Sequence, residues 1–241
     1  MSNDSSNEPS AANTGRRDAL KQLAGSAVAL AALGTAACAP AQTASATPAP
    51  ARQPGSAPAT WDMSWLDRIN KQRRMVFDTN EVSGGAGLSF VATYLAGATQ
   101  AYGDPDASTV LVHRHASVPI VLNDDMWKRL GLGETLKLKD PTTGETTQRN
   151  PFIGYKKGDA HSMVGAESGL DVLMAKGTII VACNIALTAR AYSLSQKEKT
   201  PIEQAKKELF ASLIPGVFVA PNGVFGVCAA QERGCGYIAV R

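Results

Sequence analysis

An early part of the chain combines apolar runs with a glycine-containing loop in an order that strongly limits the fold. Residues 74–79 form a short apolar run, and a loop containing three glycines follows at 84–87. Apolar side chains recur at helical spacing in residues 88–102, and residues 108–113 form a second apolar run. Two strands joined by a helical crossover pair in parallel. This segment therefore predicts a βαβ unit.

The same alternation of strands and helices continues to the end of the chain. Further strands are predicted at 178–182, 216–220 and 235–240, and further helices at 124–130, 166–176, 184–192, 201–212 and 224–233. Regular alternation of this kind is typical of α/β proteins whose sheet is covered on both faces. The predicted fold is therefore a three-layer α/β sandwich around a mostly parallel sheet.

Residues 131–159 form a long, polar and turn-rich connection. An insertion of this length in a compact domain is usually functional or part of an interface. Phe152 and Ile153 are apolar residues inside it, and with the helical segment 202–213 they are candidate surface for contacts between copies of the chain. The alternative is that these apolar residues fold back onto their own core.

A pair of arginines, Arg16 and Arg17, precedes a weakly hydrophobic, alanine-rich stretch that ends near Cys38. This arrangement is typical of a twin-arginine signal, which exports proteins that are already folded. The apolar stretch is shorter than the ~20 residues that a membrane-spanning helix needs. We therefore expect residues 1–39 to be a signal segment and the protein to reach the periplasm.

Three fates of this leader are compatible with the sequence. Residues 35–38 resemble a lipobox, in which Cys38 would be lipidated and become the mature N-terminus. The small residues ending at Ala41 or at Ala46 fit simple cleavage equally well, which would release a soluble protein. An uncleaved leader would instead tether the protein to the membrane as a signal anchor.

Residues 40–60 consist almost entirely of Ala, Pro, Ser, Thr and Gln. This composition offers too little apolar surface to offset the conformational entropy of folding, so the segment is predicted to be a linker. Residues 61–241 are numerous enough to bury a full hydrophobic core, and we expect them to form one α/β domain.

Composition and motifs exclude several classes of function. The 24 Lys and Arg and 21 Asp and Glu residues give a net charge of +3, and the basic residues are dispersed along the sequence. Nucleic acid is therefore not an expected partner, because no basic stripe could follow a phosphate backbone. The sequence has no Gly-X-Ser-X-Gly elbow, P-loop or dinucleotide fingerprint, so neither a serine hydrolase nor a cofactor is expected.

Polar side chains follow four of the predicted strands at the point where each strand ends. The carboxyl ends of parallel strands meet at one edge of a sheet, where open α/β sheets bind their ligands. We therefore expect these side chains to form a binding site. The candidates are Asn80, His113, Arg114, His115, Cys183, Asn184 and Asn222.

Cys183 lies between an apolar strand and the first turn of the following helix. Unpaired backbone N–H groups and the helix dipole favour a thiolate at such a position, and the basic residues 113–115 would stabilise it further. Cys183 is therefore the candidate catalytic nucleophile. The alternative is a buried thiol with only a packing role, which is common for free cysteines.

The other cysteines do not form an obvious disulfide. Cys38 belongs to the leader, so three of the four cysteines remain in the domain, and at least one of these thiols has no intramolecular partner. Cys228 and Cys235 are predicted to be roughly 9 Å apart along a helix axis, beyond the ~7 Å that a disulfide allows. Buried packing of both thiols is the favoured interpretation.

His113 and His115 have the spacing that places two side chains on one face of a strand. Such a pair could bind a metal ion, but no third ligand stands at a suggestive spacing and His161 is isolated in the sequence. We assign no metal site, and expect both histidines to be polar groups that line the pocket.

Five short runs of the domain carry a resemblance to a known family: VLVHRH at 110–115, NDDMW at 123–127, GTIIVACN at 177–184, LIPGVFVAPNGV at 213–224 and AQERGC at 230–235. These runs resemble the DsrE/DsrF-like family, and more narrowly its exported members with a twin-arginine leader. The resemblance implies a parallel-sheet α/β fold and assembly into trimers or hexamers. Better-known family members pass persulfide sulfur between cysteines, and their acceptor cysteine corresponds by position to Cys183.

Two hypotheses of function follow. In the first, the protein handles sulfur in the periplasm, with Cys183 accepting small sulfur species and the basic residues 113–115 binding them. In the second, it is a noncatalytic binding or assembly subunit, held near the membrane by its leader and associated with a membrane protein. The flexible linker and the long insertion at 131–159 favour the second hypothesis.

Overall fold

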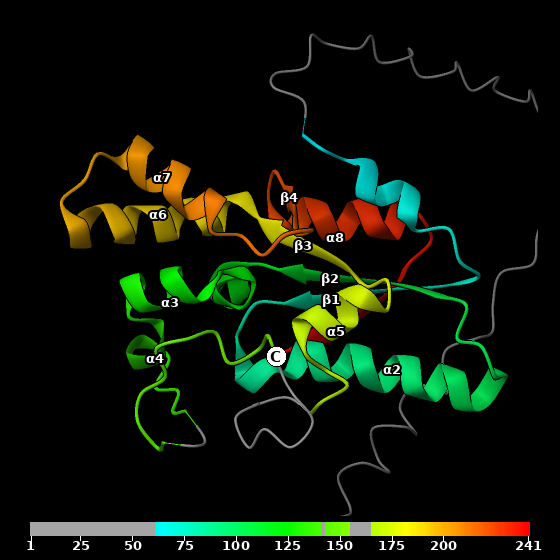
Figure 1. Cartoon of the computed structure of the whole chain (residues 1–241). Coiled ribbons are helices and arrows are strands. Elements are labelled where there is room, and N and C mark those ends of the chain that lie inside the picture. The colour runs from blue at the N-terminus through cyan, green and yellow to red at the C-terminus, as the bar shows by residue number, and fades with distance from the viewer. Residues whose placement is uncertain (1–60, 141–142, 155–164) are drawn as a thin grey trace, which may run out of the picture. The chain divides into compact units, whose positions relative to one another are not determined.

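A computed structural model of the chain describes residues 61–140, 143–154 and 165–241. Within these ranges, five strands form one parallel sheet in the order β4-β3-β2-β1-β5 (Figure 1). The strands are β1 (Arg73–Thr79), β2 (Ala107–His113), β3 (Ile179–Cys183), β4 (Phe218–Ala220) and β5 (Gly236–Val240). This sheet confirms the predicted α/β class. The predicted leader, Cys38, the linker and His161 lie outside the described residues.

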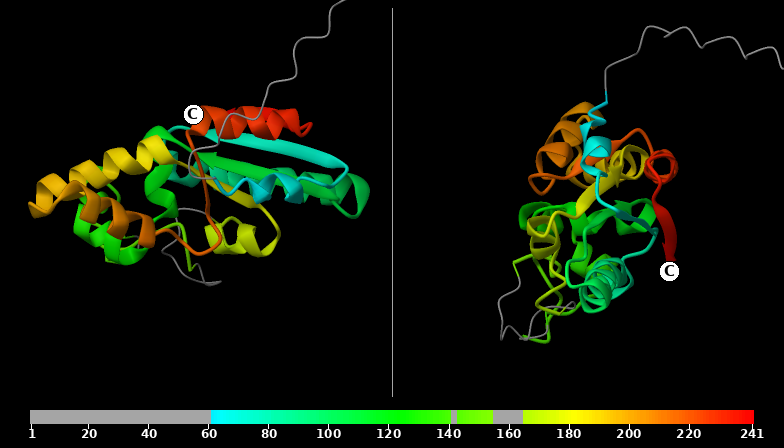
Figure 2. Two further views of the ribbon diagram at one scale, coloured as in Figure 1. Left: turned by 90° about the horizontal axis from the view of Figure 1, so that it is seen from above. Right: turned by 90° about the vertical axis from the view of Figure 1, so that its right-hand side faces the viewer.

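Helices cover both faces of the sheet, as two further views show (Figure 2). The helix α2 (Ala86–Tyr102) and the short α5 (Leu170–Ala175) lie on one face, and α8 (Gly223–Glu232) lies on the other with the 3-10 helix η1 (Ser64–Arg68). The other helices are η2 (Ser83–Gly85), η3 (His115–Val121), α3 (Asp124–Leu130), α4 (Leu132–Thr135), α6 (Asn184–Glu198) and α7 (Ile202–Ala211). None of the helices in the described ranges has the length and apolar character needed to cross a bilayer.

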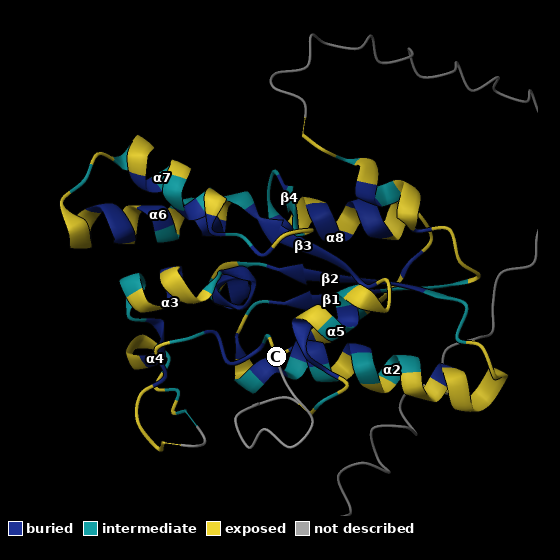
Figure 3. Cartoon of the chain, viewed as in Figure 1, coloured by how far each residue is buried: buried dark blue, intermediate teal, exposed yellow. Residues whose placement is uncertain are grey.

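The strands at the centre of the sheet are buried on both sides (Figure 3). In β2, Leu111 packs into the cluster formed with α2 and α5, whereas Val110 and Val112 pack into the cluster formed with η1 and α8. This division follows from the two-residue period of a strand, which sends successive side chains to opposite faces. The near-continuous apolar runs seen in the sequence are what a doubly covered parallel sheet requires.

Part of the long insertion belongs to the hydrophobic core. Phe152 is fully buried against Trp127, with ring centroids 6.1 Å apart. The side-chain amide of Asn150 donates hydrogen bonds to the carbonyl groups of Ile120 and Leu122, at 2.8 and 2.7 Å, and its oxygen accepts one from the backbone N–H of Phe152 at 3.0 Å. Of the two interpretations, Phe152 therefore follows the second and packs into the core of its own domain, because Asn150 anchors this segment there.

The helical segment 202–213 also lacks the exposed apolar face that we expected. Ala205 and Leu209 of α7 are buried, and Ile202, Phe210 and Leu213 are half-buried against the same core. The helix α6 extends to Glu198, six residues beyond the predicted end. It continues because Leu194 is buried within the core that α6 shares with α7.

Candidate functional site

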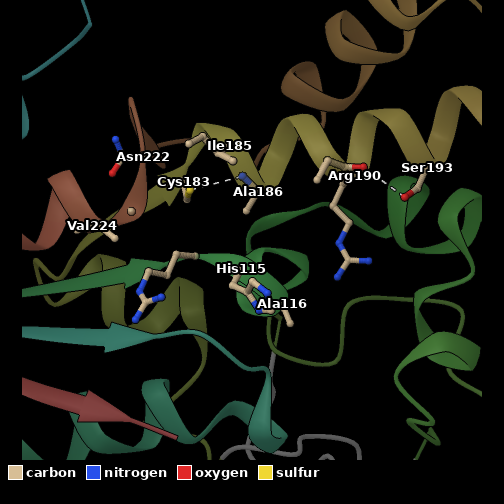
Figure 4. A pocket seen from close by; sticks show the side chains of 12 residues that line it. His115, Ala116, Cys183, Ile185, Ala186, Arg190, Ser193, Asn222 and Val224 are labelled. Atoms are coloured by element: carbon tan, nitrogen blue, oxygen red, sulfur yellow. Dashed lines mark hydrogen bonds between the residues drawn. The ribbon is translucent and has the colours of Figure 1, made fainter.

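A cavity of about 450 Å³ lies at the carboxyl edge of the sheet, between the first turns of α6 and α8 (Figure 4). Its walls come from the ends of β2, β3 and β4 and from the helices that follow them. This is the edge where open parallel sheets bind their ligands. The lining residues used below are Arg114, His115, Cys183, Ile185, Ala186, Ala189, Arg190, Asn222, Gly223 and Val224.

Two helix N-termini meet at this cavity. Cys183 is the N-cap of α6, and its Sγ accepts a hydrogen bond from the backbone N–H of Ala186 at 3.5 Å. Asn222 is the N-cap of α8, and its Oδ1 accepts a hydrogen bond from the backbone N–H of Phe225 at 2.8 Å. Both helix dipoles therefore present their positive ends to the cavity, which favours an anion there.

Cys183 is the thiol that lines this cavity. The residue is 6% exposed, and Figure 4 shows its sulfur between the start of α6 and the loop that carries Asn222. Serine, threonine and aspartate cap helices better than cysteine does. Helix capping alone therefore does not account for a cysteine at this position.

Arg114 is held beside the cavity by a buried carboxylate. Its Nε and one terminal nitrogen donate to Asp78 at 2.6 and 2.9 Å, and the hydroxyl of Tyr237 donates to the same carboxylate at 3.0 Å. The pKa of Arg114 is raised, first by the hydrogen bond to Asp78 and also by the negative charge of that carboxylate. A bidentate pair of this kind fixes the guanidinium plane.

Gly223 makes this position of Arg114 possible. A Cβ atom added at Gly223 would lie 2.4 Å from the Cβ and 2.9 Å from the Cδ of Arg114. A Cβ at Gly226, one turn later in the same helix, would meet Ala220 and Val181 at 3.4 and 3.5 Å, which is ordinary contact. Only glycine therefore lets the start of α8 approach Arg114 so closely.

We predict that Gly223→Ala lowers the free energy of unfolding by about 1–3 kcal/mol, because either the α8 backbone or Arg114 must move. Gly226→Ala is the matched control, and it should leave stability unchanged or raise it by up to ~1 kcal/mol through helix propensity. Urea denaturation of both variants measures the difference. Equal stabilities would contradict the close approach.

Arg190 is a second cation in the cavity. It lies on α6, and Figure 4 shows its side chain extending toward the side of the cavity where His115 lies. Its guanidinium has no hydrogen bond or ion pair with any residue in the described ranges. Burial lowers the pKa of Arg190. The cavity thus holds one arginine, Arg114, that is paired with a carboxylate, and a second, Arg190, that has no carboxylate partner in the described part of the chain.

The structure separates the two histidines that we expected to share a face. The strand ends at His113, and His115 adopts a left-handed conformation with φ of 52°. His115 lines the cavity, and its side chain is exposed, with Nδ1 4.0 Å from Oε1 of Glu81. His113 is fully buried, with Nδ1 3.2 Å from the hydroxyl of Thr79. The expectation that His113 lines the pocket is therefore wrong.

Two predicted asparagines also lie apart from the cavity lining. Asn184 is the first residue of α6, and Asn80 follows β1 with a buried side-chain oxygen that has no partner in the described part of the chain. Of the predicted candidates, Arg114, His115, Cys183 and Asn222 are brought together. The ranges that the structure describes contain no cluster of His, Cys, Asp and Glu suited to a metal ion.

Sequence reasoning missed Arg190, Asp78, Tyr237 and Gly223. Arg190 carries a recognisable signal, because it stands seven residues after Cys183 and therefore on the same face of α6. Tyr237 carries none, since its contact with Asp78 joins residues 159 positions apart in sequence.

The remaining thiols of the domain differ from Cys183 in position. Cys183, Cys228 and Cys235 are free among the residues that the structure describes. The prediction that both remaining thiols are buried is confirmed for Cys235 and wrong for Cys228, which is exposed on α8. Burial raises the pKa of Cys235 to about 11. Neither of these two thiols lines the cavity.

Comparison of the sequence with models of known protein families and with curated proteins finds no match.

Proposed function

We propose that this chain is a thiol protein of the DsrE-like kind that accepts sulfane sulfur at Cys183 and passes it on in the periplasm. The observation that carries the proposal is the position of this thiol in a cavity where two helix N-termini and two arginines meet. Positive potential of this kind stabilises a thiolate and attracts anionic sulfur species. The resemblance to the sulfur-relay proteins supports the same residue as acceptor.

The reaction needs no cofactor. The Cys183 thiolate attacks the outer sulfur of a persulfide, R–S–SH, and a new S–S bond forms at Cys183 while the S–S bond of the donor breaks. The donor leaves as the thiolate R–S⁻, so atoms, charge and electrons balance. Transfer onward is the same exchange with an acceptor thiolate as the attacking group.

A second candidate function is a noncatalytic assembly subunit tethered at the membrane. It is favoured by exposed apolar side chains that line the cavity, since Ile185 and Val224 are 63% and 62% exposed. Exposed apolar groups that gather in one place are typical of protein contacts. A membrane-associated partner, or further copies of this chain in a trimer or hexamer, would cover them.

We expect Cys183 to take up more sulfur than Cys228 when the full chain is treated with polysulfide. Cys228 is the internal reference, because it is the more exposed thiol yet lies outside the cavity. Alkylation followed by peptide mass spectrometry measures the extra sulfur on each cysteine. If accessibility alone determined the reaction, Cys228 would carry more sulfur than Cys183. More sulfur on Cys228 than on Cys183, or no sulfur on Cys183, would contradict the proposal.

A further inference from the structure

The cavity is far larger than an inorganic sulfur species requires. It measures about 450 Å³, whereas a two-sulfur anion fills the space of a few water molecules, roughly 100 Å³. Cavities of roughly 300–1,000 Å³ are typical of sites for small organic molecules. Space therefore remains for a carbon skeleton beside the reacting sulfur atoms.

The extra space runs along one face of α6. Cys183, Ala186 and Arg190 stand at positions i, i+3 and i+7, so they follow one another on a single helix face. The axial rise between Cys183 and Arg190 is about 10 Å. Figure 4 shows the Arg190 side chain extending across the helix axis, toward the side of the cavity where His115 lies. The separation between the thiol and the guanidinium is therefore set mainly by this rise, and it matches a molecule of several bonds.

The two ends of this face differ in chemistry. Near Cys183, the charge of Arg114 is matched by Asp78. Farther along, the guanidinium of Arg190 is half-buried and has no acidic partner within the described ranges. Between them the wall is apolar, formed by Ile185, Ala186 and Ala189. An unpaired, partly desolvated guanidinium is best satisfied by a planar oxyanion that accepts two parallel hydrogen bonds.

We propose that the sulfur donor or acceptor at this site is a small organic thiol compound with a carboxylate, bound by Arg190, and that its sulfur lies against Cys183. This inference rests on the proposed function. The carboxylate accepts hydrogen bonds from the Arg190 guanidinium, and the carbon chain lies against Ala186 and Ala189. In transfer, Cys183 attacks the outer sulfur of the bound persulfide, and the organic thiolate leaves with its carboxylate still paired to Arg190.

Donor selectivity tests the proposal. The probes are the persulfide of N-acetylcysteine, which carries a carboxylate, and the persulfide of N-acetylcysteine amide, which carries a neutral amide in its place. The protein is the full chain carrying Cys38→Ser and Cys228→Ser, and the measured quantity is the rate at which Cys183 gains sulfur. We expect the carboxylate donor to react roughly tenfold faster at low concentration. Equal rates for the two donors would overturn the proposal.

Charge variants identify the residue responsible for this selectivity. Arg190→Gln should remove the preference for the carboxylate donor, so that the ratio of the rates with the two donors falls to about one. Lys197→Gln is the matched control, because Lys197 is an exposed cation two turns farther along α6, and its loss should preserve the preference. A preference that survives Arg190→Gln, or that disappears equally with Lys197→Gln, would overturn the assignment.

A binding measurement separates this inference from the proposed function. Cys183→Ser cannot react, so the unreactive analogues S-methyl-N-acetylcysteine and its amide report binding alone by NMR titration. Stronger binding of the carboxylate, abolished by Arg190→Gln, supports the anion site even if Cys183 takes up no sulfur from any donor. Equal binding of both analogues overturns the inference even where sulfur transfer succeeds.

Discussion

Replacing Cys183 with serine is expected to lower sulfur uptake at this position by roughly 100-fold or more, because a serine hydroxyl stays protonated near neutral pH and does not attack sulfane sulfur. The fold should survive the change. Serine is a favoured N-cap, so its hydroxyl can accept the backbone N–H of Ala186 that Cys183 accepts now. We expect the free energy of unfolding to change by no more than ~1 kcal/mol.

Cys228→Ser is the control for this prediction. Cys228 is exposed on α8, and its loss should remove only the sulfur carried by that thiol. Whole-protein mass spectrometry after polysulfide treatment, together with urea denaturation, measures both variants. An unchanged total uptake in Cys183→Ser would contradict the proposed role, and the noncatalytic alternative would then be favoured.

Acid is expected to destabilise this protein through His113. Burial lowers the pKa of His113 to about 3, whereas an exposed histidine in the unfolded chain titrates near ~6.5. Above pH ~6.5 both states are neutral, so His113 adds no pH dependence. As the pH falls below that value, the His113 imidazole binds a proton in the unfolded state but not in the folded state. The loss of stability is about 1.4 kcal/mol per pH unit, or roughly 3 kcal/mol at pH 4.5.

The surroundings of His113 explain why the folded protein rejects the proton. The hydroxyl of Thr79 donates to the carbonyl of Val112 at 2.7 Å, so its oxygen can accept the Nδ1–H of His113. The other ring nitrogen, Nε2, is buried with no partner in the described part of the chain. A proton on Nε2 would therefore create a buried charge with no acceptor, which is costly.

Two variants isolate this contribution from that of the carboxylates. His113→Asn keeps a polar atom near Thr79 but cannot titrate, so its stability should fall less between pH 7 and pH 4.5 than that of the unchanged protein. His115→Asn is the matched control, because it makes the same substitution at a histidine whose side chain is exposed and not buried. Urea denaturation at both pH values measures the slopes. Parallel slopes for all three proteins would contradict the assignment to His113.

Much of the site follows from local sequence rules. Arg114, Cys183 and Asn222 each stand just after the apolar run of a predicted strand. Because open parallel sheets bind ligands at the carboxyl ends of their strands, this rule predicts that the three residues share one site. The same rule includes His113, but it does not say which way a side chain points. Leu111 and His113 share one face of β2. When both faces of a sheet are covered, sequence alone does not tell which face leads to the cavity and which to the core.

The sequence by itself determined the order of strands and helices, the parallel sheet and the edge at which polar groups gather, because these depend on short-range periodicity and on strand direction. Only the tertiary structure decided that Asp78 and Tyr237 hold Arg114, that Arg190 has no acidic partner among the described residues and that Phe152 belongs to the core. Those facts depend on contacts between residues distant in the chain. No local pattern encodes them, because each is fixed by how the elements pack.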